Sequence, residues 1–351
     1  MDRELIVDSP EARLTGSWFF RLRLEIINCE GRGMPTIIST RSTRSTRSTR
    51  STRSTRSTRS GEGFDEIAYS PLYGDARVSA RERVVGPIDT IENDRDIPAA
   101  RVMAHDAHVR HEIFDYELSE GLAVQPAIDP SKGALALSHK DKATGEWTDL
   151  AQFDAPSQED LRLPEQLGQV LGYARLRSEN LAEITVQVED IVTSFDMVVS
   201  MSAERHKYTY ELLDLVVNMA TRYHFPIKHQ LNVPRPAEIS AQVQPMLPHP
   251  GHPSFPSGHA TEARVVAQVL LALLEAAGVS AEYCSNAYVQ LDRHAKAIAK
   301  NRIVAGLHFP CDNVAGDCLG HAMAKHFVCR LSDNSSAELR DLWEAAKAEW
   351  Q

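Results

Sequence analysis

The chain has 351 residues, of which 42% are hydrophobic and 25% are charged, so it can bury one large core or two smaller ones and is not disordered throughout. Its 48 acidic residues outnumber its 38 Lys and Arg residues and give a net charge of −10. Seven of the arginines lie in one repeat tract, so the rest of the chain is more acidic still. We therefore expect no nucleic-acid partner outside that tract.

The sequence predicts no membrane span. Its longest apolar run, from Val265 to Leu274, is about half the ~20 residues that a transmembrane helix needs. The N-terminal residues show no basic region followed by an apolar one, and the five cysteines form no CxxC pair. These features predict a soluble protein in a reducing, cytoplasmic setting.

The first 60 residues are interpreted as a tail that contains a disordered tether at 39–60. The tether repeats Ser-Thr-Arg seven times and ends with one further serine. A three-residue period without an apolar member cannot bury a face as helix or strand. We expect a flexible cationic linker here, although a contact with nucleic acid or acidic lipid remains the alternative.

Residues 61–155 are expected to form a loop-rich section, because turn-rich pieces alternate with short apolar runs such as GALALSH, which suggests a small hairpin. Residues 156–335 are expected to form a helical catalytic core, followed by a C-terminal helix or tail at 336–351. The fold class predicted is mainly α, a helical bundle. Its helices are expected at Glu165–Arg177, Asn180–Phe195, Ala203–Tyr223, Thr261–Ala277, Ala281–Ala305 and Asn313–Val328.

The helix expected at Ala260–Ala277 is apolar in almost every direction, which is typical of a helix buried at the centre of a bundle. Directly before it, Ser257, Gly258 and His259 occupy a turn in the run HPSFPSGHA. Free backbone N–H groups and the positive end of the helix dipole meet at such a turn. The sequence therefore predicts an anion site at this helix N-terminus.

Two further segments carry charged residues suited to the same site. Upstream, KHQLNVPRP contains Lys228 and Arg235, and the following proline keeps the arginine extended. Downstream, NRIVAGLHFPCD contains Arg302, His308 and Asp312. Together with the turn, these groups could surround a tetrahedral or trigonal-bipyramidal oxyanion.

In these three motifs the sequence resembles the superfamily of type-2 phosphatidic acid phosphatases and vanadium-dependent haloperoxidases. The superfamily signature is K-x6-R-P, then P-S-G-H, then S-R-x5-H-x3-D, and all three parts occur here in order between Lys228 and Asp312. One position departs from it, since Asn301 stands where the family usually has serine. The resemblance implies the helical-bundle fold of that family.

The resemblance also implies a role for each matching residue. The side chains of Lys228, Arg235 and Arg302 would neutralise the equatorial oxygens of phosphate or vanadate, and Ser257 and the Gly258 N–H would add hydrogen bonds. His308 would bond to phosphorus, or to vanadium as its metal ligand. Asp312 would fix the tautomer of His308, and His259 would be the general acid and base.

The signature is common to both enzyme classes. The absence of a predicted span, the long helical stretch before the first motif and His252 favour a haloperoxidase with vanadate as cofactor, because bromide-oxidising members carry a histidine at the position of His252 near the oxyanion. We therefore place a bromide-oxidising haloperoxidase first. The alternative is a soluble phosphatase that hydrolyses phosphate monoesters through a phosphohistidine and needs no cofactor. A third possibility is a non-catalytic phosphate-binding protein, against which the presence of both His259 and His308 argues.

Small molecules are the expected partners: halide and peroxide for the haloperoxidase, or a phosphate ester for the phosphatase. Members of the haloperoxidase branch often assemble, so the resemblance also implies a possible homo-oligomer.

Overall fold

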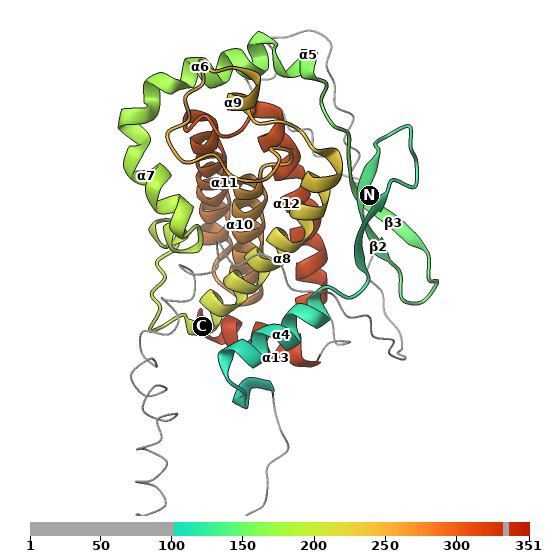
Figure 1. Cartoon of the computed structure of the whole chain (residues 1–351). Coiled ribbons are helices and arrows are strands. Elements are labelled where there is room, and N and C mark those ends of the chain that lie inside the picture. Colours follow the sequence, from blue (N-terminus) through green and yellow to red (C-terminus); the bar gives the residue numbers. More distant parts are fainter. Residues whose placement is uncertain (1–101, 333–336) are drawn as a thin grey trace, which may run out of the picture.

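A computed structural model describes residues 102–332 and 337–351 (Figure 1). The N-terminal tail, the repeat tract at 39–60 and the first part of the expected loop-rich section lie outside the described residues. The described part is mainly helical, which confirms the predicted fold class.

The remainder of the section expected to be loop-rich contains regular structure. A helix and three strands follow a short 3-10 helix, in the order η2 (Val102–Ala104), α4 (Ala107–Leu118), β1 (Leu122–Pro126), β2 (Leu135–Lys140) and β3 (Trp147–Phe153). The strands form an antiparallel sheet in sequence order, so the GALALSH run supplies the middle strand rather than a separate hairpin. Leu137 and Phe153 on the sheet join the same hydrophobic core as the helices. The sheet therefore belongs to one body with the bundle.

The helical core surrounds one central helix. Its segments are α5 (Gln158–Leu161), η3 (Pro164–Gly168), α6 (Gln169–Tyr173), η4 (Ala174–Leu176), α7 (Arg177–Glu189), η5 (Val192–Met197), α8 (Lys207–Leu231), α9 (Pro236–Ile239), α10 (Gly258–Ala276), α11 (Ala281–Val304), α12 (Pro310–Ser332) and α13 (Ala337–Ala348). Helix α10 packs against α8, α11 and α12 (Figure 1). Its valines and leucines are buried on several sides, as the sequence predicts, and Gly278 follows its end with a φ of +79°.

Several predicted helix boundaries are wrong, including one near residue 177 and one at the end of α8. The chain does not break near residue 177, because helical segments follow one another from Pro164 to Glu189 and end at Asp190, which is extended. Helix α8 does not stop at Tyr223 but continues past Pro226 to Leu231. A proline removes one hydrogen bond, yet the buried face continues through Ile227. This extension puts Lys228 on a helix.

No helix in the described ranges combines the length and the apolar character that crossing a membrane requires.

Helices α10 and α12 approach closely where α12 carries two glycines. A Cβ on Gly316 would overlap the carbonyl oxygen of Ser257, and a Cβ on Gly320 would lie 2.7 Å from the carbonyl oxygen of Thr261. Both positions therefore require glycine for steric reasons. Gly316 packs against Ser257, the residue that begins the first turn of α10. The packing of these two helices therefore also fixes the position of that turn.

We predict that Gly316→Ala lowers the free energy of unfolding by about 1–3 kcal/mol, the usual cost of forcing a methyl group into a packed interior. Gly172→Ala in α6 is the matched control, because a Cβ there meets nothing within 4 Å and alanine favours a helix. Denaturant unfolding of both variants measures the difference. Equal stability of the two variants would contradict this account of the α10–α12 contact.

Candidate functional site

The first turn of α10 is built as the sequence predicts. Ser257 is the N-cap residue, and its side chain accepts a hydrogen bond from the backbone N–H of Ala260. The Ser257 backbone N–H donates to the carbonyl of Asp312 at 2.9 Å, which joins this turn to the beginning of α12. A Cβ at Gly258 would lie 2.9 Å from Nε2 of His224, so the close approach of that ring requires glycine.

A buried carboxylate holds the ring of His308. Nδ1 of His308 lies 3.0 Å from Oδ2 of Asp312, and the same oxygen accepts hydrogen bonds from the Phe309 backbone N–H and the Ser254 hydroxyl. Both His308 and Asp312 are buried. With Nδ1 as the donor, the lone pair of the neutral ring is on Nε2, which lies 3.4 Å from Nη1 of Arg235.

Backbone carbonyls hold two of the cations. Lys228 Nζ donates to the carbonyl of Ser254 at 2.8 Å. Arg235 is extended immediately before Pro236, as predicted, and its guanidinium donates to the carbonyls of His252 at 2.9 Å and Leu307 at 2.7 Å. Neutral acceptors therefore fix both side chains without neutralising them.

The third cation, Arg302, retains unused donors. Its Nη2 donates to the carbonyl of Ile184 and to Oε1 of Gln187, each at 3.1 Å. Its Nε and Nη1 are buried and have no hydrogen-bond partner among the described residues. Unsatisfied buried donors on a cation are costly. An oxyanion bound beside them would supply the acceptors.

Burial and mutual repulsion shift the pKa values of these groups. Burial, followed by the charge of Arg235, lowers the pKa of Lys228 to about 7. Burial lowers the pKa values of Arg235 and Arg302 to about 10. Burial, with Lys228 and Arg235 nearby, holds the pKa of His308 well below its ordinary value, so its ring is neutral. Burial also raises the pKa of Asp312, against the opposing effect of the hydrogen bonds it accepts.

The other two histidines lie beside this cluster. His252 Nδ1 is 3.2 Å from Nη2 of Arg235, and its ring meets the edge of Phe225 with centroids 5.0 Å apart. Burial, Lys228 and Arg235 lower the pKa of His252 to about 4. His259 follows Gly258 in the first turn of α10, close enough to His308 for their charges to interact.

The structure thus gathers the motif residues at one end of the bundle. Hydrogen bonds or direct charge interactions link six of them, namely Lys228, Arg235, His252, His259, His308 and Asp312. Ser257 and Gly258 form the adjoining turn. Arg302 is connected through Glu262, a buried carboxylate on α10 whose charge raises the pKa values of both Arg302 and Lys228.

Several residues of this cluster were missed by the sequence analysis. Glu262 could have been found, because it is a charge on an otherwise apolar helix next to PSGH. His224 precedes Lys228 by four residues and therefore shares its helix face, but the predicted end of α8 at Tyr223 hid this relation. Ser254 lies inside the HPSFPSGHA run, but its contacts with Lys228 and Asp312 join positions remote in sequence. Gln187 lies outside all three motifs, and nothing local in the sequence indicates it.

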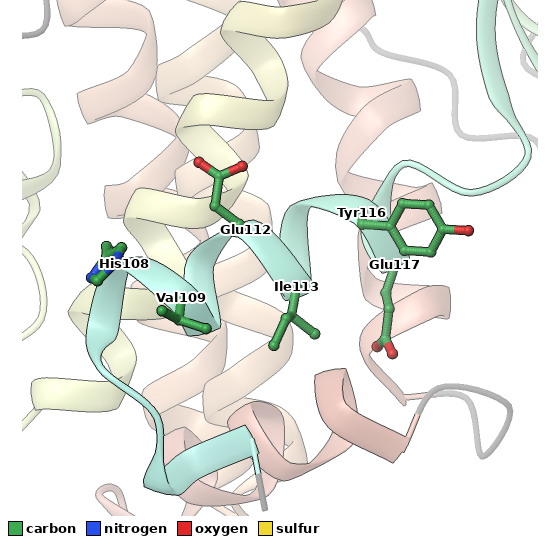
Figure 2. Close-up of a pocket in the computed structure, with 6 residues that line it drawn as sticks. All are labelled: His108, Val109, Glu112, Ile113, Tyr116 and Glu117. Carbon is green, nitrogen blue, oxygen red and sulfur yellow. The ribbon is translucent and has the colours of Figure 1, made fainter. Parts of the chain in front are cut away.

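A separate open hollow lies on α4 and does not resemble an anion site. Figure 2 shows the six residues that line it, all from this helix: His108, Val109, Glu112, Ile113, Tyr116 and Glu117. Two of them are acidic and none is Lys or Arg. Helix α4 contacts α8 through pairs such as Arg110–Glu211 and Asp115–Arg222.

Three comparisons with known proteins bear on this arrangement. Curated proteins gave no match. Among solved structures, one match is the crystal structure of the first transmembrane PAP2 type phosphatidylglycerolphosphate phosphatase from Bacillus subtilis, at 20% identity and a TM-score of 0.30, over 46% of this chain and 74% of that chain. The family model of the PAP2 superfamily matches residues 211–335, which include all three motifs. This match confirms the superfamily that the motifs predict, and residues 211–335 belong to the PAP2 superfamily.

Proposed function

We propose that the chain is a phosphatase that hydrolyses phosphate monoesters through a phosphohistidine intermediate on His308. The observation that carries the proposal is the buried ring of His308, held at Nδ1 by Asp312, with Nε2 beside Arg235; burial and the nearby cations lower its pKa and so favour the neutral, nucleophilic form. This order reverses the one suggested by the sequence, which placed the haloperoxidase first. Every group needed for ester hydrolysis belongs to the chain itself, whereas halide oxidation also needs vanadate and peroxide.

The first half of the reaction forms one bond and breaks one. The Nε2 lone pair of His308 attacks phosphorus, and the bond from phosphorus to the ester oxygen breaks. His259 gives its proton to the departing alkoxide, so the alcohol leaves neutral. In the second half, His259 takes a proton from water, and that water attacks phosphorus and releases phosphate from His308.

The cations stabilise the charge on the transferring group. Lys228, Arg235 and Arg302 would bind the equatorial oxygens, and the Gly258 N–H at the N-terminus of α10 would add a hydrogen bond. These donors are fixed before the substrate binds, because backbone carbonyls and the Gln187 amide hold the cationic side chains. Little reorganisation is then needed as charge develops.

The charges in the pocket favour an anion with more than one negative charge. The three cations face two buried carboxylates, Glu262 and Asp312, so one positive charge is left uncompensated when Lys228 is protonated. His259 adds a second positive charge when it is protonated, as its role as general acid requires, and a phosphate monoester dianion compensates both charges. Lys228 is the cation whose protonation changes within the physiological pH range, because its pKa is about 7.

We predict that the affinity for sulfate, which keeps its charge across this range, weakens by about tenfold or more from about pH 6 to about pH 8.5. Lys228 loses its proton as the pH rises through its pKa, and the pocket then loses one positive charge. Competitive inhibition of p-nitrophenyl phosphate hydrolysis measures the affinity. Lys228→Met should bind sulfate weakly at every pH; an undiminished pH dependence in that variant would assign the titration to another group.

A haloperoxidase remains the second candidate, because His252 lies against Arg235 at the site. Vanadate has the shape and charge of phosphate, and the same cations, with His308 as its ligand, would hold it. When bound, it would activate peroxide for halide oxidation. The phosphatase and the haloperoxidase would therefore require the same positions and charges of the cations and of His308.

We predict that the two histidines respond differently to substitution. His308→Ala should abolish p-nitrophenyl phosphate hydrolysis and any phosphohistidine, since no other group replaces the nucleophile. His259→Ala should keep sulfate affinity within about tenfold, because the cations and the helix N-terminus remain, while turnover falls by roughly 10²–10⁴.

Stopped-flow and steady-state assays on both variants, with trapping of the phosphorylated protein, measure these effects. Parallel assays of bromide oxidation with vanadate and peroxide compare the two candidates. Vanadate-dependent bromide oxidation without ester hydrolysis in the unmodified chain would overturn the phosphatase proposal. Loss of sulfate binding in His259→Ala but not in His308→Ala would reverse the assigned roles.

A further inference from the structure

We infer that Gln187 on α7 is a positioning residue, which aims the free donors of Arg302 at the bound anion while leaving the guanidinium charge intact. This inference rests on the proposed function, because it takes Arg302 as one of the cations that bind the anion. It concerns a residue outside the three motifs, on a helix that precedes all of them in the sequence.

The contacts of Gln187 fix one edge of the guanidinium. Its side chain is 3% exposed, and its Oε1 accepts hydrogen bonds from Nη2 of Arg302 at 3.1 Å and Nδ2 of Asn301 at 3.0 Å. The carbonyl of Ile184, one turn earlier on α7, accepts from the same Nη2. With Nη2 bound to α7, the planar group leaves Nε and Nη1 without hydrogen-bond partners among the described residues. Nε and Nη1 lie on different edges of the guanidinium, one on each side of Nη2, so each can donate a single hydrogen bond to an anion oxygen.

The acceptor that Gln187 offers to Arg302 is a neutral amide oxygen, and its neutrality matters for anion binding. A carboxylate in place of the Gln187 amide would form a buried ion pair with Arg302 and cancel the charge needed for anion binding. The amide oxygen orients the group without neutralising it. Glu262, whose charge also acts on Arg302, already supplies partial compensation from the α10 side. A neutral acceptor on α7 therefore preserves the attraction for an anion.

Asn301 explains how Gln187 is held in place. Its Nδ2 also donates to Glu183 at 3.0 Å, and its Oδ1 accepts from Nδ2 of Asn180 at 2.7 Å. The side chain of Asn301 thus bonds to three residues of α7, whereas the serine usual at this motif position has a single proton to donate. Asn301, the residue that departs from the motif, therefore joins α7 to α11 next to Arg302.

The test uses two substitutions at Gln187 and one control, all in the full-length chain. Gln187→Met keeps the size of the side chain but removes the acceptor, and Gln187→Glu keeps the acceptor but adds a charge. Gln290→Met on the exposed face of α11 is the control for the chemical change. For each variant, sulfate affinity is measured from the sulfate-dependent shift in melting temperature, and kcat and KM are measured with p-nitrophenyl phosphate.

We expect Gln187→Glu to weaken sulfate affinity by about tenfold or more, with a larger loss above neutral pH as the carboxylate ionises. Gln187→Met should also weaken it, by a smaller factor, because the guanidinium loses its orientation but keeps its charge. Gln290→Met should match the unmodified chain. A purely structural role would instead lower the melting temperature without sulfate and leave the sulfate affinity unchanged.

Arg302→Met separates this inference from the proposed function. If that variant loses sulfate affinity and both Gln187 variants retain it, the positioning role is wrong and the pocket stands. If Arg302→Met itself binds sulfate normally, the anion does not use Arg302 and both proposals fail. If Gln187→Glu does not fold, the test rests on Gln187→Met. Unchanged sulfate affinity in Gln187→Met then contradicts the inference.

Discussion

Burial of three cationic side chains at one end of the molecule is the constraint on which the arrangement of this bundle depends. Lys228, Arg235 and Arg302 are each 1% exposed, and removing such charges from water costs several kcal/mol apiece, about what buried ions cost in other proteins. The protein offsets part of that cost with neutral acceptors and two carboxylates, and the remainder is available to attract an anion. This incomplete compensation of charge is the basis on which we propose that the site binds oxyanions.

The fold meets this constraint by bringing backbone carbonyls to the cations. The segment between α9 and α10 supplies carbonyls to Lys228 and Arg235, the turn before α12 supplies another to Arg235, and α7 supplies one to Arg302. Central helix α10 adds its N-terminal N–H groups from within the core. The glycines of α12 allow the close approach that keeps this end of α10 in place.

Much of the cluster could be predicted because its members occur in three short motifs. The fixed spacings in those motifs place Arg235 before a proline, Gly258 in the first turn of a helix, and Asp312 one helical turn after His308. The predicted central helix and the mainly helical class were right for the same reason, since they depend on local periodicity. The roles of these residues in catalysis stay predictions.

The rest depends on contacts between remote segments. Gln187 and Asn301 are far apart in sequence and meet only because α7 packs on α11, which a single sequence does not reveal. The predicted end of α8 at Tyr223 is too early, because the buried face of the helix continues past Pro226 to Lys228. The sheet strands were too short and too mixed in composition to be separated from turns.

A crystal structure of the full-length protein soaked with vanadate would test the central claim most directly. The account predicts one anion at the N-terminus of α10, with vanadium bonded to Nε2 of His308, an anion oxygen accepting a hydrogen bond from Nε or Nη1 of Arg302, and the Gln187 amide still bound to Nη2. An anion bound elsewhere, or a vanadium ligand other than His308 with Arg302 turned away, would contradict the claim that these buried cations form one oxyanion pocket.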